Sequence, residues 1–141
     1  MAVLAGIPWF EILLVIPPAI ALGYDPLLVG VAAFLGNLLP IYAIVAFHER
    51  VTAWWAARRG DDEADEGGRA GRARRIWAGY GLPGLALAGP ILTGVHLATV
   101  LALLLGGSRR RVAGWMTASL AAWTVALVVA SVAGLSALGL G

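Results

Sequence analysis

The charged residues of this 141-residue chain are confined to two stretches, and this segregation restricts the fold more than any other feature. Of ten basic and eight acidic residues, 13 lie within residues 49–75 and three more within residues 109–111. Only Glu11 and Asp25 remain elsewhere. Because 60% of the residues are hydrophobic, the chain lacks the polar exterior that a soluble domain needs. We therefore expect an integral membrane protein with almost no soluble part.

The composition also excludes several classes of function. The net charge of +2 does not indicate a nucleic-acid partner, because the arginines flank hydrophobic segments, where they set membrane orientation. The chain has no cysteine, hence no disulfide and no thiol nucleophile. Nothing resembles a metal site, a catalytic triad or a phosphate-binding glycine loop, so we expect no enzyme activity and no cofactor.

Four hydrophobic segments can be marked along the chain, and none alternates like a barrel strand. The first covers residues 3–23 and is interrupted by Pro17 and Pro18. The second, residues 27–47, is long enough to span a hydrocarbon core of ~30 Å. The third, residues 82–106, is broken by Gly89-Pro90 and by Thr93-Gly94. The fourth, residues 112–138, has no proline and is the most regular.

The positive-inside rule gives the topology. The polar stretch 48–76 holds seven arginines, so we expect it in the cytoplasm, with residues 60–71 forming a flexible loop. The patch of Arg109, Arg110 and Arg111 should be cytoplasmic by the same rule. Both can be inside only if the third segment enters and leaves by one face of the inner membrane. The third segment is therefore predicted to be re-entrant, turning at one of its breaks.

The two halves then match in plan. We expect a single all-α membrane domain over residues 1–141, in which residues 1–47 and 80–141 are inverted half-repeats and residues 48–79 form a cytoplasmic loop. Each half would be a Pro/Gly-broken re-entrant hairpin followed by a transmembrane helix. Interrupted hydrophobic segments at corresponding places in two halves indicate a transporter's binding site.

Glu11 is the one carboxylate inside a hydrophobic segment. An acid within the membrane costs a few kcal/mol or more, and is by default a candidate functional residue. Desolvation would raise its pKa, which suits proton coupling or a cationic substrate. The alternative is that Glu11 lies near the outer interface and reaches water.

The other candidate site residues are a histidine, the arginine patch, and the helix breakers and uncharged polar residues of the hydrophobic segments. His96 could relay protons or bond to Glu11, or could simply satisfy a backbone carbonyl at the break. The arginine patch 109–111 could bind anionic lipid headgroups or only set topology. The remaining substrate-site candidates are the helix breakers and uncharged polar residues at membrane depth: Pro17, Pro18, Asn37, Pro90, Thr93 and Gly94.

Several short motifs resemble the small multi-drug export proteins. They are Glu11 followed by Pro17 and Gly23, the Gly36-Asn37 pair, and the stretch from Tyr80 through Pro90 to Thr93-Gly94. That family is similar to the wider DedA superfamily, whose members are thought to have two re-entrant hairpins and to move lipid-linked phosphates or support drug resistance. The resemblance implies Glu11, Pro17, Gly36, Asn37, Pro90, Thr93 and Gly94 as site positions. DedA relatives carry an arginine in the second hairpin, and residues 82–106 contain none.

The sequence therefore favours a proton-coupled exporter of a small, cationic or amphiphilic substrate. A DedA-like polyprenyl-phosphate translocase, a bundle of four plain spans like the small multidrug resistance exporters, and a non-transporting membrane scaffold are alternatives. With two full spans the chain is small for enclosing a pathway alone, so we expect a homodimer in contact with membrane lipids.

Overall fold

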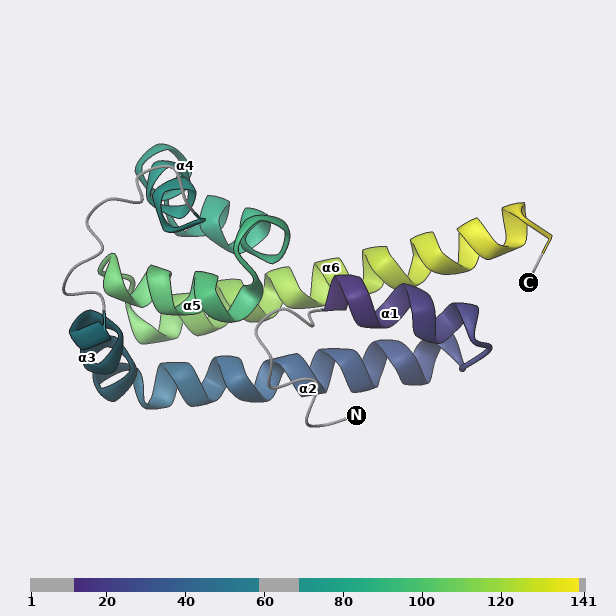
Figure 1. Ribbon diagram of the computed structural model, residues 1–141, viewed down its shortest axis with the longest axis horizontal. Coiled ribbons are helices and arrows are strands. Elements are labelled where there is room, and N and C mark those ends of the chain that lie inside the picture. The colour runs from purple at the N-terminus through teal and green to yellow at the C-terminus, as the bar shows by residue number, and fades with distance from the viewer. Residues whose placement is uncertain (1–11, 59–68, 140–141) are drawn as a thin grey trace.

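The computed structural model describes residues 12–58 and 69–139, and these residues form six helices (Figure 1). They are α1 (Ile12–Ala21), α2 (Pro26–Ala46), α3 (His48–Arg58), α4 (Arg69–Leu92), α5 (Val95–Leu104) and α6 (Arg109–Ala137). No strand occurs in the described residues. The all-helical fold expected from the sequence is confirmed.

The two longest apolar helices, α2 and α6, run antiparallel and pack along each other (Figure 1). Asp25 begins α2 by accepting a hydrogen bond from the backbone N–H of Leu28 at 2.9 Å, with Pro26 in the first turn. Both helices are long and apolar enough to cross a membrane. Their bounds agree closely with the second and fourth segments predicted from the sequence.

Helix α1 corrects the prediction for the first segment. Pro17 and Pro18 lie inside this helix rather than at a break. A proline ring fits helical φ, and each proline removes one hydrogen bond, so a pair can be carried within a helix packed on its neighbours. Ile12, Ile16 and Ile20 form the buried face of α1, which contacts α6 and α2. Any hairpin partner of α1 would lie in residues 1–11, outside the described residues.

The polar stretch is more helical than predicted. Helix α3 covers residues 48–58, and α4 begins at Arg69, inside the range expected to be a loop. Alanine and arginine are good helix formers, which explains helix in a stretch without a core-facing apolar pattern. Helix α4 bends at Gly81, whose φ of 66° and ψ of −155° are not helical. The bend separates a charged arm from an apolar arm, residues 82–92.

The third segment forms a tight helical hairpin between the apolar arm of α4 and α5. The turn is at Thr93-Gly94, one of the two predicted breaks, and Gly94 has a φ of 89°. Gly89 and Pro90, the other predicted break, lie inside α4. A Cβ built on Gly89 would lie 2.6 Å from the Cβ of Ala98, so the two helices approach closely because residue 89 has no side chain.

The turn between α1 and α2 has the same backbone hydrogen bonds as the turn between α5 and α6. Each bond in the second turn occurs 83 residues after its counterpart in the first. In the first turn the backbone N–H groups of Leu22, Gly23, Tyr24 and Val29 donate to the carbonyls of Pro18, Ile20, Ala19 and Asp25, in that order. In the second turn the N–H groups of Leu105, Gly106, Gly107 and Val112 donate to the carbonyls of Leu101, Leu103, Ala102 and Ser108. Gly23 and Gly106 both have positive φ.

The buried positions correspond at the same spacing. Helix α1 ends at Ala21 and α5 ends at Leu104, 83 positions later. Residues 12–47 contain eight buried residues, and six of them have buried counterparts 83 positions later. The six are Ile12, Ile16, Ile20, Ala33, Asn37 and Ile41, and their counterparts are Val95, Thr99, Leu103, Met116, Leu120 and Thr124. The counterparts of the other two, Gly30 and Val45, are half-buried. The pair α1–α2 and the pair α5–α6 thus share register, turn geometry and most of the buried face.

Candidate functional site

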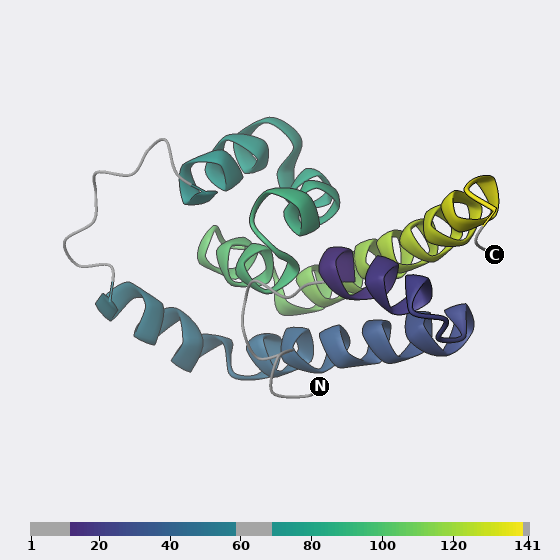
Figure 2. The same ribbon diagram turned by 45° about the vertical axis from the view of Figure 1, so that its right-hand side comes forward.

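The N-terminal ends of α1 and α5 lie near each other about halfway along α6 (Figures 1 and 2). From there the two helices run in opposite directions, α1 toward the C-terminal end of α6 and α5 toward its start. Ile12 and Val95, the first residues of the two helices, are fully buried. Helix α5 has its N-cap at Gly94, so the partial positive charge of its N-terminus lies at this central region of the bundle.

Two predicted site residues meet next to this region. The imidazole of His96, on α5, hydrogen-bonds to the backbone of Asn37, on α2. The side-chain amide of Asn37 is itself buried and donates to the carbonyl of Ala33 at 2.9 Å. Asn37 therefore makes two hydrogen bonds: its side chain bonds within α2, and its backbone bonds to His96 of the second hairpin. Among the predicted candidates that the structure describes, His96 and Asn37 join two different helices.

Pro90, Thr93 and Gly94 lie at and before the hairpin turn. The hydroxyl of Thr93 lies 3.4 Å from the carbonyl oxygen of Gly89 and 3.3 Å from that of Gly94, to which it can donate. The backbone N–H of Gly94 donates to the same Gly89 carbonyl at 2.7 Å. These bonds close the end of α4, so Thr93 has a role in shaping the turn whether or not it also contacts a substrate.

Two residues that the sequence did not indicate hold this hairpin to α6. Pro90 has no N–H to offer the carbonyl of Ala86, four residues earlier. The hydroxyl of Ser119 donates to that carbonyl at 2.6 Å, and the indole N–H of Trp123 donates to the neighbouring carbonyl of Leu87 at 2.9 Å. Backbone groups freed by proline at membrane depth need such partners from adjacent helices. The sequence could have indicated these contacts only through the spacing of Ser119 and Trp123, which are four residues apart and so lie on one face of a helix.

The arginine patch forms the first turn of α6 rather than a loop. Arg109 lies 3.3 Å from Glu49 at the start of α3, and both side chains are half or more exposed. Positive charge at a helix N-terminus opposes the helix dipole, so the patch does not serve the helix itself. The ion pair joins two residues 60 positions apart at one end of the bundle.

The remaining predicted residues are not part of this cluster. Pro17 and Pro18 lie along α1, where Pro17 is half-buried and Pro18 exposed. Glu11 precedes the buried Ile12 but lies outside the described residues, so its predicted bond to His96 stays a prediction. In the part of the chain that the structure describes, no three His, Asp or Glu side chains gather as metal ligands would.

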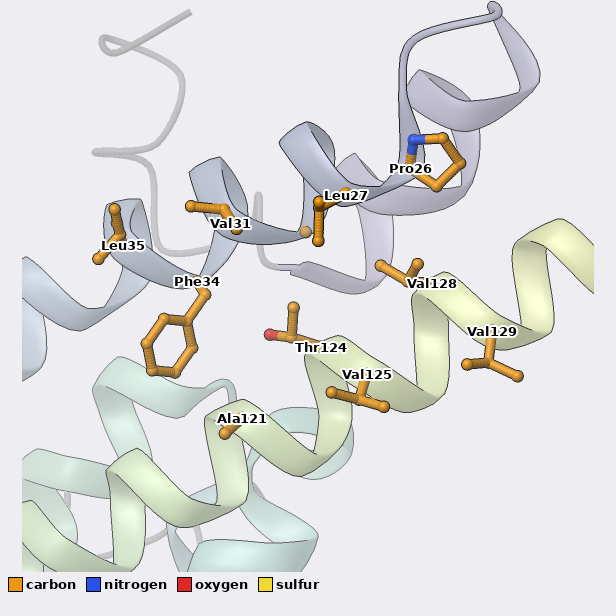
Figure 3. Close-up of a pocket in the computed structure, with 11 residues that line it drawn as sticks. Pro26, Leu27, Val31, Phe34, Leu35, Ala121, Thr124, Val125, Val128 and Val129 are labelled. Atoms are coloured by element: carbon orange, nitrogen blue, oxygen red, sulfur yellow. The ribbon is translucent and has the colours of Figure 1, made fainter.

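A separate apolar groove of about 320 Å³ lies between α2 and α6 (Figure 3). Its lining residues come from the first half of α2 and the second half of α6, with Phe34 and Val128 among them. Thr124 is its one polar side chain, and the hydroxyl donates to its own helix, to the carbonyl of Leu120 at 2.7 Å. The proton of the Thr124 hydroxyl is therefore engaged, and the rest of the groove is lined by apolar side chains that suit hydrocarbon.

Comparison with known proteins gives one match. The family model described as "putative small multi-drug export protein" matches residues 11–126, which is 116 of the 141 residues and includes every described helix at least in part. No curated protein and no solved structure matches the chain significantly.

Proposed function

Because the chain belongs to the small multi-drug export protein family, we propose that it is a small membrane transporter that exports a cationic or amphiphilic substrate in exchange for protons. The family and the two helices long enough to span point to a membrane location, and a family of exporters is consistent with a protein that is not an enzyme.

The observation that carries the proposal is the ion pair between Glu49 and Arg109. It supports placing the two arginine-rich stretches on one side of the membrane, as the positive-inside rule requires. The chain between them, α4 and α5, must then leave and return by that side. Helix α5 has ten residues, about 15 Å, which reaches the middle of a hydrocarbon core of ~30 Å. A re-entrant second hairpin accounts for both findings.

The shared register of the two halves extends this argument. The pairs α1–α2 and α5–α6 have equivalent turns and buried positions 83 residues apart, and they run in opposite directions (Figure 1). This supports inverted half-repeats. In such transporters the site forms where the half-helices meet near the bilayer midplane. Here that place is the region around Ile12, Val95 and the contact between Asn37 and His96.

In this proposal Glu11 is the proton-coupling acid, because it is the one carboxylate inside a hydrophobic segment of the sequence and directly precedes the buried Ile12. In a hydrocarbon environment the neutral form of a carboxyl group is favoured, which suits a group that changes protonation during transport. His96 is its candidate proton partner, and Asn37, Pro90, Thr93 and Gly94 are candidates for the substrate surroundings.

The coupling role is tested with the Glu11→Gln variant in proteoliposomes. A pH difference is imposed across their membrane, and the transport of a fluorescent cationic dye is measured. We expect the variant to lose proton-driven dye transport while inserting at normal levels. Glu49→Gln, which removes an exposed carboxylate at the end of the bundle, is the matched control and should transport normally. Normal transport by Glu11→Gln would remove Glu11 from the site, and an inactive wild type across dyes would favour a scaffold role.

The topology is tested separately by thiol labelling of single-cysteine variants at Gly60 and Ser108, since the native chain has no cysteine. Both positions should label from the cytoplasmic side only. Labelling from opposite sides would make the third segment a full span and end the re-entrant model.

A DedA-like translocase would need a cationic group for the phosphate in the second hairpin. The 82–106 stretch has no arginine or lysine, and the exporter is therefore the better proposal. Two full spans per chain also make a homodimer part of it, and a monomeric mass in mild detergent would count against that part.

A further inference from the structure

One face of α6 near its start forms a shallow groove that the export proposal does not use. Arg111, Gly114, Trp115 and Ala118 line it, and its volume is about 340 Å³. These positions are spaced three or four residues apart, so they share one side of the helix. All four are exposed, and Trp115 is 39% exposed. The groove starts at the charged end of the helix and continues into its apolar part.

The positive charge at the Arg111 end of the groove is not balanced by a nearby acidic side chain among the described residues. Arg109 is engaged with Glu49, whereas neither Arg110 nor Arg111 has an acidic partner among the described residues. The first turn of α6 adds the partial positive charge of its free N–H groups. An anion at Arg111 would thus meet both a guanidinium and the end of a helix dipole.

The shape of the groove depends on Gly114. A Cβ built at this position would meet no atom within 4 Å, so internal packing does not require glycine there. Its missing side chain, with the small Ala118 one turn further, leaves a channel beside the Trp115 ring. From Arg111 to Ala118 the channel runs about 10 Å along the helix, from the interface toward the hydrocarbon.

We propose that this groove binds one anionic phospholipid. Its phosphate lies at Arg111, and an acyl chain follows Gly114 and Ala118 against the indole ring of Trp115. A cation at the interface above an apolar channel matches such a lipid, and tryptophan is typical of this depth. The inference depends on the membrane location of α6 and not on what the protein exports.

The test is native mass spectrometry of the delipidated full-length protein in mild detergent, titrated with phosphatidylglycerol or with phosphatidylcholine. We expect one phosphatidylglycerol adduct to form at lower lipid concentration than any phosphatidylcholine adduct. Arg111→Gln should weaken that adduct about fivefold, the effect of one interfacial charge. Arg110→Gln, which removes the same charge from the same turn outside the groove, should leave it nearly unchanged.

The channel is tested with charge held constant. Gly114→Leu fills it and should weaken the adduct at least as much as Arg111→Gln does. Gly134→Leu, at another position of α6 where a Cβ meets nothing, should not. Equal losses in Arg110→Gln and Arg111→Gln, or an unaffected Gly114→Leu, would overturn the site in favour of general surface charge. Displacement of the adduct by inorganic phosphate would overturn the lipid as its ligand.

Discussion

Helix α1 and the hairpin formed by the apolar arm of α4 with α5 are held in place by different kinds of contact. Helix α1 is held by apolar side chains, Ile12, Ile16 and Ile20, packed on α6 and α2. The second hairpin is held by directional hydrogen bonds as well. The side chains responsible are those of His96, Ser119 and Trp123. The residues 83 positions earlier are Leu13, Gly36 and Pro40, and none of these has a side chain that can donate a hydrogen bond.

Helix α1 and the second hairpin therefore need not be mechanically equivalent. Apolar contacts are non-directional and tolerate sliding, whereas a hydrogen bond in a medium without water fixes both partners. We therefore regard the second hairpin as anchored to α6, and α1 as the element freer to shift during transport. The following predictions test that anchoring, in order of decreasing expected effect.

Gly89 lies where the two arms of the anchored hairpin approach each other closely. Gly89→Leu should lower the free energy of unfolding by about 3 kcal/mol, because its side chain would overlap Ala98. Reversible unfolding in mixed detergent micelles measures this. The matched control is Gly36→Leu, at a position where a Cβ meets nothing within 4 Å. If both variants were equally stable, the arms of the hairpin would not be packed together.

Removing the serine anchor should have the next largest effect. Ser119→Ala leaves the Ala86 carbonyl without a donor, and we expect a loss of about 1–2 kcal/mol in the same assay. Ser131→Ala is the control on the same helix, because its hydroxyl donates only to the Leu127 carbonyl of its own helix. Equal losses for the two serines would contradict the special role of Ser119.

The tryptophan anchor should contribute somewhat less. Trp123→Phe keeps an aromatic ring but removes the indole N–H that donates to Leu87, so about 1 kcal/mol should be lost. Trp115→Phe, at a more exposed position of α6, controls for the change of ring size. If Trp123→Phe matched the wild type, the tryptophan would be packing alone.

The ion pair at the end of the bundle should be the weakest contact. A double-mutant cycle of Glu49→Gln and Arg109→Gln should give a coupling of about 0.5 kcal/mol or less, because exposed pairs are well solvated. The coupling should shrink further in high salt. A large, salt-insensitive coupling would mean that this contact, rather than the hydrogen bonds, anchors the second half.

The sequence predicted the long helices well and the breaks only in part. The helices in residues 27–47 and 112–138 could be predicted because an apolar run of that length is typical of a membrane-spanning helix. Prolines were less informative. Pro17, Pro18 and Pro90 all lie inside helices, since tertiary partners can satisfy the carbonyls that proline frees. The turn came at Thr93-Gly94, where glycine provides a positive φ.

The anchoring residues could not be predicted in the same way. Ser119 and its acceptor at Ala86 are 33 positions apart, and only the packing of α6 on α4 brings them together. The bend at Gly81 was hidden among 19 glycines. The His96 and Asn37 candidates were found from the cost of polar groups at membrane depth, but their contact depends on the crossing of α5 with α2.

The unequal lengths of α2 and α6 have a consequence for the surrounding bilayer. At 21 residues α2 is about 32 Å long, whereas α6, at 29 residues, is about 44 Å long. A hydrocarbon layer of ~30 Å matches α2, but it is too thin for an upright α6. The longer helix must lean or extend past the layer, each at a modest cost per ångström. Membrane thickness thus acts on α6 more than on α2, and a thicker bilayer favours a more upright α6 in this protein.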